Sequence, residues 1–219
     1  MTRLTTLALA TPSQTVGPFF HDALLCPGSL CDVLVPPNAE GELIRIEGVV
    51  YDGDRSPVPD AMIEIWQADH HGRYAHRVDG GSMPNEPAFT GFGRCGTDAA
   101  GMYGFDTVKP GAIAYDAIRS QAPHISVAVF ARGVLNHLFT RLYFSGEAGN
   151  DVDPVLERVH PERRASLLAR RTMRGERTVY VFDIVLQGDG ETVFFDFVRI
   201  RALESGGAPD DASRRAGGA

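Results

Sequence analysis

The stretch ELIRIEGVVYD, residues 42–52, alternates apolar and polar side chains. Successive side chains of a β-strand point to opposite faces, so this alternation is typical of a strand with one buried face. Further apolar runs follow, separated by turn residues: AMIEIWQAD (61–69), GMYGFDTV (101–108), HISVAVFA (124–131), VLNHLFTRLYF (134–144), VYVFDIVLQ (179–187) and ETVFFDFVRI (191–200). Many short strands with turns between them predict a mostly β protein, a two-sheet β-sandwich or a barrel.

Three parts of the chain differ in composition. Residues 1–41 are rich in Pro, Gly, Thr and Ser, which predicts an extended N-terminal arm that packs on a partner chain. Residues 42–200 carry the strand pattern, and residues 201–219 are small and polar, which predicts a disordered tail. The segment PERRASLLARR, 161–171, starts with Pro and Glu and ends with Arg, an order that suits the dipole of a short helix.

Overall charge and cysteine content exclude several classes of protein. The chain has 219 residues, a net charge of −7 and no basic stripe, so a nucleic-acid partner is not expected. No run approaches the ~20 apolar residues of a membrane span. The three cysteines, Cys26, Cys31 and Cys95, have no CxxC spacing and favour free thiols in a reducing cytoplasm.

Two short motifs contain side chains that could bind a metal. His124 and Ser126 lie two apart in an apolar run and would share one face of a strand. Two imidazoles at that spacing could bind one metal, but a neutral serine hydroxyl is a poor ligand. Tyr74 and His76 have the same spacing. Taken alone, these residues favour the simpler interpretation, a hydrogen-bonded histidine at a strand start and a packed tyrosine.

Two other motifs contain residues that could line a binding pocket. Arg132 lies in FARGV, 130–134, between two apolar runs, where its guanidinium could bind a carboxylate through two hydrogen bonds. An ordinary exposed arginine in a turn is the alternative. In TPSQTVGPFF, 11–20, Gly17 and Pro18 restrict the backbone, so the segment could wall a pocket or form a surface loop.

Taken together in chain order, the motifs resemble those of the intradiol ring-cleaving dioxygenases. The resemblance covers roughly residues 11–197 and is carried by these segments: TPSQTVGPFF, IEIWQAD, GRY, GFGR, TVKPG, APHISVAVFARG, HLFTRLYF and YVFDIVLQGDGETVFFDF. TPSQTVGP, FARG and GETVFFDF are most similar to the alpha subunits of heteromeric members. The resemblance implies a two-sheet β-sandwich, with Fe(III) held by two tyrosines and two histidines in the iron-bearing chain.

The resemblance also implies that this chain lacks half of those ligands. The four family positions fall on Tyr74, Ile113, His124 and Ser126, so one tyrosine and one histidine are replaced. Ile offers no lone pair, and Ser stays protonated near neutral pH. We therefore expect four vestigial ligand positions, no metal and no catalytic residue in this chain, with Fe(III) bound by a homologous beta subunit of an (αβ)n hetero-oligomer.

In such an assembly, Gly17, Pro18 and Arg132 would line the substrate pocket. The implied reaction is O2-dependent cleavage of 3,4-dihydroxybenzoate to 3-carboxy-cis,cis-muconate, a step of the beta-ketoadipate pathway of aromatic catabolism. Two alternatives stay open. One is a stand-alone dioxygenase that binds iron through Tyr74, His124 and either His76 or Tyr115, and the other is a metal-free β-sandwich binding or assembly module.

Overall fold

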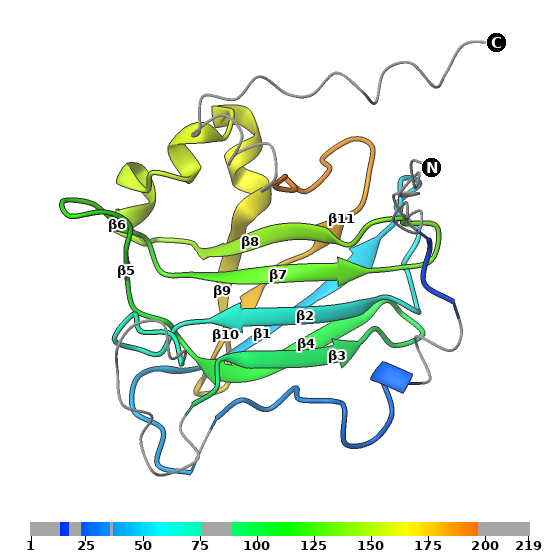
Figure 1. The fold of residues 1–219 in the computed structure, drawn as a ribbon, viewed down its shortest axis with the longest axis horizontal. Helices are drawn as coiled ribbons and strands as arrows, with labels where there is room; N and C mark the ends of the chain where they lie inside the picture. Colours follow the sequence, from blue (N-terminus) through cyan, green and yellow to red (C-terminus); the bar gives the residue numbers. More distant parts are fainter. Residues whose placement is uncertain (1–13, 18–22, 36, 76–88, 197–219) are drawn as a thin grey trace, which may run out of the picture.

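Two facing layers of β-strands form the protein (Figure 1). The structure is a computed structural model and describes residues 14–17, 23–35, 37–75 and 89–196. One layer has the order β3-β2-β7-β8, with bounds Phe92–Gly96, Met62–Gln67, His124–Phe130 and Leu138–Phe144. The other has β1 between β4 and β10, followed by β9, with bounds Leu43–Tyr51, Met102–Val108, Arg177–Val181 and Leu168–Arg174. The predicted mostly β, two-sheet architecture is confirmed.

Most neighbouring strands are antiparallel, and one parallel contact joins the two layers. β8 pairs with β9 where Tyr143 lies opposite Leu168 and Phe144 opposite Ala169. β1 is parallel to β10 and to the short strand β11, Ile184–Val185. A separate two-stranded ribbon, β5 (Ile113–Ala114) with β6 (Ser120–Gln121), projects at the end of the sandwich where β7 begins (Figure 1).

The core lies between the layers because each strand turns its apolar side chains inward. On β1, Ile44, Ile46 and Val50 are at most 1% exposed, as the alternation in residues 42–52 predicts. The cluster that they join draws on both layers and includes Ile63, Ile65, Phe105, Ile125, Val127, Val129, Leu142, Phe144 and Tyr180. A second, smaller cluster packs Tyr143 of β8 under Leu156, Val159 and Leu167.

The segment 161–171 differs from the predicted helix. Residues Pro161–Leu167 form the 3₁₀ helix η4, and Leu168 begins strand β9. The first half follows the helix-start signal of Pro161, but Leu168 and Ala169 pair with β8, and Arg170 and Arg171 pair with β10. Sheet pairing overrides local propensity there. Two shorter 3₁₀ helices, η2 (Ala148–Val152) and η3 (Leu156–Arg158), precede it.

Two expected strands are shorter or absent in the described residues. The run 134–144 contributes strand only from Leu138, and residues 191–196 form no strand, although Phe195 N–H donates to Phe139 O. Residues 197–219, including the predicted tail, lie outside the described residues.

Part of the N-terminal arm packs on this chain itself. The backbone of Cys31 exchanges two hydrogen bonds with Arg94 of β3, and Val33 forms a bridge to Asp106 of β4. These contacts connect the edges of the two layers. The arm is therefore held against the sandwich before it reaches Glu42.

Replacing a core aromatic residue should destabilise the fold strongly. Phe105 on β4 is fully buried, so Phe105→Ala should lower the free energy of unfolding by about 3–5 kcal/mol through lost burial and a residual cavity. Met102→Ala on the same strand is the control, because Met102 is 43% exposed and its loss should cost about 0.5 kcal/mol or less. Denaturant unfolding measures both. Equal losses for the two variants would contradict the assigned core.

Candidate functional site

The first residues of β7 place two of the predicted positions on the outer face of the sheet. Ile125, Val127 and Val129 point into the core, so His124 and Ser126 point the opposite way. Ser126 lies directly opposite Trp66 of β2 on one side and Arg141 of β8 on the other. Directly opposite residues share a face, so these three side chains form a row across the sheet.

Tyr74 joins this row through its ring. Its aromatic ring stacks on Trp66 with 6.2 Å between ring centroids and 6° between ring planes. Burial raises the pKa of the Tyr74 phenol, while the positive charge of Arg141 opposes this rise. Tyr74 is therefore a neutral phenol at neutral pH, close enough to Arg141 to be influenced by its charge.

Close backbone packing brings Ile113 to the same end of the sandwich. Gly72 has φ +78°, and a Cβ atom there would overlap the backbone oxygen of Ala112. Gly111 N–H donates to Asp69 O at 3.0 Å, which ties the two loops together. Ile113, which is buried, then pairs with Gln121 across the β5–β6 ribbon. All four positions expected to be vestigial thus gather around the start of β7.

His124 is a buried, neutral imidazole. Its Nδ1–H donates to the carbonyl of Ala122 at 2.8 Å, and its ring lies 5.5 Å from that of Tyr143. Burial, reinforced by the charge of Arg141, lowers the pKa of His124 to about 4. The bond at Nδ1 leaves Nε2 as the lone-pair nitrogen, an arrangement also found in metal-binding histidines.

Arg141 is the charged residue of this site, and sequence reasoning did not single it out. Its Nη1 donates to Gln121 Oε1 at 2.7 Å and to Tyr143 Oη at 3.3 Å. Tyr143 Oη in turn donates to Asp153 Oδ1 at 3.2 Å. Arg141 Nε is also buried and has no hydrogen-bond partner in the described structure. The only sequence signal was its place in HLFTRLYF, facing outward on the strand beside Ser126.

Tyr115 does not take part in the site. Its hydroxyl accepts a hydrogen bond from Arg158 Nη2 at 3.3 Å, and Arg119 lies over its ring, 5.0 Å from the centroid. The phenol oxygen therefore points to η3. The alternative in which Tyr115 replaces the lost tyrosine is not supported, and His76 lies outside the described residues.

A second group of predicted residues lies at the other end of β7, roughly 20 Å away at ~3.3 Å per residue. Gly133 N–H donates to Thr15 Oγ1 at 2.8 Å, which fixes the arm against the turn. The arm (14–17) and residues 130 and 134–137 line a recess of about 340 Å³ that includes Gly17. Arg132, 73% exposed, forms an ion pair with Asp60, and Pro18 lies outside the described residues.

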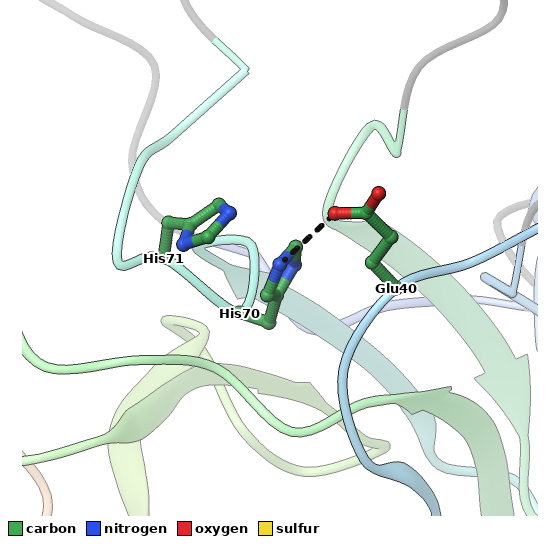
Figure 2. A group of neighbouring side chains, drawn as sticks. All are labelled: Glu40, His70 and His71. Carbon is green, nitrogen blue, oxygen red and sulfur yellow. Dashed lines mark ion pairs between the residues drawn. The ribbon is translucent and has the colours of Figure 1, made fainter.

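One group of potential metal ligands includes two residues of the turn that carries Gly72. Glu40, His70 and His71 each offer an atom within 4.8 Å of the others (Figure 2). His70 Nε2 is 3.5 Å from Glu40 Oε2, and the two imidazole rings are in contact. Glu40 is 79% exposed, so we interpret this cluster as a surface ion pair at the turn after β2.

Comparison with known proteins identifies the family. A sequence profile described as dioxygenase matches residues 32–188. The chain belongs to this dioxygenase family. It is 46% identical to the protocatechuate 3,4-dioxygenase alpha chain of Burkholderia cepacia, over 85% of this chain and 96% of that one. The Pseudomonas putida alpha chain is 44% identical over the same shares. The B. cepacia beta chain is 38% identical, over 82% and 77%.

Solved structures support the dioxygenase fold. Hydroxyquinol 1,2-dioxygenase from Pseudomonas putida DLL-E4 superposes with a TM-score of 0.59 at 20% identity, covering 80% of this chain and 66% of that one. In the described part of the chain, every helix is too short or too polar to cross a bilayer. The resemblance to intradiol dioxygenases seen in the sequence motifs is thereby confirmed at the level of family and fold.

This dioxygenase family is iron-dependent, but the four positions of this chain that we expect to be vestigial do not fit Fe(III). A ferric ion prefers several anionic or strongly basic donors. Here the donors are one protonated phenol at Tyr74, one imidazole at His124 and one neutral hydroxyl at Ser126, beside an aliphatic Ile113. The guanidinium of Arg141 adds a permanent positive charge. The side chains at the start of β7 therefore do not form a site for Fe(III).

Close packing of the two site loops depends on Gly72. Gly72→Ala would combine a positive φ with overlap on Ala112 O, so it should destabilise the protein by more than the ~1–2 kcal/mol of left-handed strain alone. Gly175→Ala is the matched control, because Gly175 has φ +65° with open space around its Cβ position. Unfolding free energies separate the two contributions, and equal losses would show that the loops can move apart freely.

Proposed function

We propose that this chain is the iron-free alpha subunit of an αβ protocatechuate 3,4-dioxygenase, whose Fe(III) is held by a homologous beta subunit. The observation that carries the proposal is the loss of two of four ligand positions, at Ile113 and Ser126, in a chain that is similar to alpha chains over nearly their whole length. The free cysteines favour assembly in a reducing cytoplasm.

In this proposal, the arm and the turn that follows β7 contact the substrate. Gly17 of the arm and the turn that carries Arg132 lie next to one another because Thr15 bonds to Gly133. We assign Gly17, Pro18 and Arg132 to the wall of a pocket completed by the beta subunit. The recess is lined by apolar side chains such as Phe130, Val134 and Leu135 and by the polar residues Gln14, Thr15, Asn136 and His137, a mixture that suits an aromatic ring with polar substituents.

Arg132 suits the carboxylate of protocatechuate. A guanidinium can donate two parallel hydrogen bonds to a carboxylate, which sets both position and orientation. Asp60 already pairs with Arg132 and competes with the substrate for its charge. The side chain is otherwise exposed, so part of the binding free energy depends on exclusion of water by the partner.

In the assembled enzyme, this chain binds and orients the substrate. Iron held by the partner would supply the reactivity of the catechol toward O2, and the expected product would be 3-carboxy-cis,cis-muconate. Gly17 lines the recess, and Arg132 anchors the carboxylate away from the reacting carbons. No residue of this chain moves a proton in this proposal.

Iron content tests the proposed division between subunits. The chain purified alone should contain no stoichiometric iron, show no visible tyrosinate colour and lack dioxygenase activity, because two ligands are missing. Mixed with an iron-bearing beta chain, it should form a stable complex with iron on the beta chain only. His124→Ala should leave the iron content of that complex unchanged. Stoichiometric, coloured iron in the isolated chain would overturn the proposal.

Arg132 should affect substrate binding rather than assembly. Arg132→Ala removes a charge-assisted contact that contributes about 1.5–3 kcal/mol when buried. Because Asp60 competes for the same guanidinium, we expect the lower end of this range, which corresponds to a rise of about tenfold in KM for protocatechuate. Steady-state kinetics of the assembled enzyme measures this change. Catechol, which lacks the carboxylate, is the control substrate. An equal rise in KM for both substrates would exclude carboxylate recognition by Arg132.

A further inference from the structure

The vestigial site contains a cation of its own. Arg141 stands opposite Ser126 in the row that also includes Trp66, and Tyr74 stacks on that tryptophan. Two of the four family ligand positions, Tyr74 and His124, are both influenced by the charge of Arg141. A metal held by those two side chains would have to share their surroundings with the guanidinium.

The guanidinium is anchored by neutral partners. Gln121, which pairs with Ile113 across the β5–β6 ribbon, accepts from Nη1 at 2.7 Å. Tyr143 contacts the same nitrogen at 3.3 Å and donates to the fully buried carboxylate of Asp153. Asp153 also accepts backbone hydrogen bonds from Ala122, Val155 and Leu156. The position of Arg141 is therefore set by three elements: the ribbon, β8 and the η2–η3 segment.

No ion pair in the described residues neutralises Arg141 directly. The carboxylate that balances its charge, Asp153, acts through the phenol of Tyr143. A guanidinium has no lone pair to offer a metal and does not lose its proton in proteins. It therefore repels an incoming Fe(III) ion with a charge that screening by water reduces little at a half-buried position.

We propose that Arg141 excludes iron from this chain, because its guanidinium occupies the position of the metal among the former ligand positions and already provides a positive charge there. The loss of ligands at Ile113 and Ser126 is then only half of the reason that the chain is iron-free. The inference rests on the proposed function for its assignment of these positions. It adds that returning the two ligands is insufficient while Arg141 remains.

Ligand restoration with and without Arg141 tests this inference. Ile113→Tyr and Ser126→His together return the four-ligand set, and Arg141→Gln is added in a second full-length variant. Each protein is incubated with Fe(III) citrate, desalted, and measured for iron per chain and for the visible tyrosinate-to-iron absorption. Iron uptake should be at least about tenfold higher with Arg141→Gln, because one positive charge next to a trivalent ion costs more than a factor of ten in binding.

Three controls isolate the role of Arg141. Arg163→Gln in the restored-ligand background removes the same charge from η4 and should not increase uptake. His70→Ala disables the surface cluster with Glu40 and His71, so iron bound there is not counted (Figure 2). Circular dichroism and thermal unfolding verify the fold, and Arg141→Met replaces Arg141→Gln if that variant does not fold.

The outcomes distinguish this inference from the proposed function. Iron in the unmodified chain would overturn the proposed function. Equal uptake by the restored-ligand variants with and without Arg141 would overturn only the inference about Arg141. A folded restored-ligand variant that also carries Arg141→Gln, and that still binds no iron through tyrosinate, would overturn the inference about Arg141 as well.

Discussion

The alternation of side chains along β7 is the constraint on which both the core and the candidate site depend. Ile125, Val127 and Val129 fill the space between the layers, and this burial sets the register of the strand. His124 and Ser126 must then face outward beside β8. A shift of one residue would bury the serine and expose the core, so the site geometry is maintained by core packing.

Loops complete the site because their backbones approach closely. The turn after β2 and the segment before β5 meet at Gly72 and Gly111, where side chains would not fit. This contact carries Tyr74 and Ile113 to the start of β7 from distant parts of the sequence. In the proposed function, the backbone of the four expected ligand positions is kept, while the side chains of Ile113 and Ser126 offer no metal ligand. Such retention is expected where the same packing also supports the fold.

The two ends of β7 have different roles in the proposed assembly. At its start, a buried neutral histidine and an anchored arginine make a stable polar cluster without metal. At its end, the arm, the recess and Arg132 present an incomplete wall that another chain can close. Separation of these roles lets one subunit lose its own metal site while it keeps the surface that serves a neighbour.

The sequence by itself determined the sandwich class and the family, because strand alternation and motif order are local properties of the chain. The four ligand positions stay a prediction from the resemblance. It also predicted that Arg132 and Gly17 belong to one region, which the bond between Thr15 and Gly133 supports. Only the tertiary structure decided that residues 168–174 form a strand, because β8 and β10 supply the pairing partners. Likewise, Arg141 reads as an ordinary charged residue in HLFTRLYF. Its role depends on Ser126, Gln121 and Tyr143, and pairing across strands is what places a cation beside them.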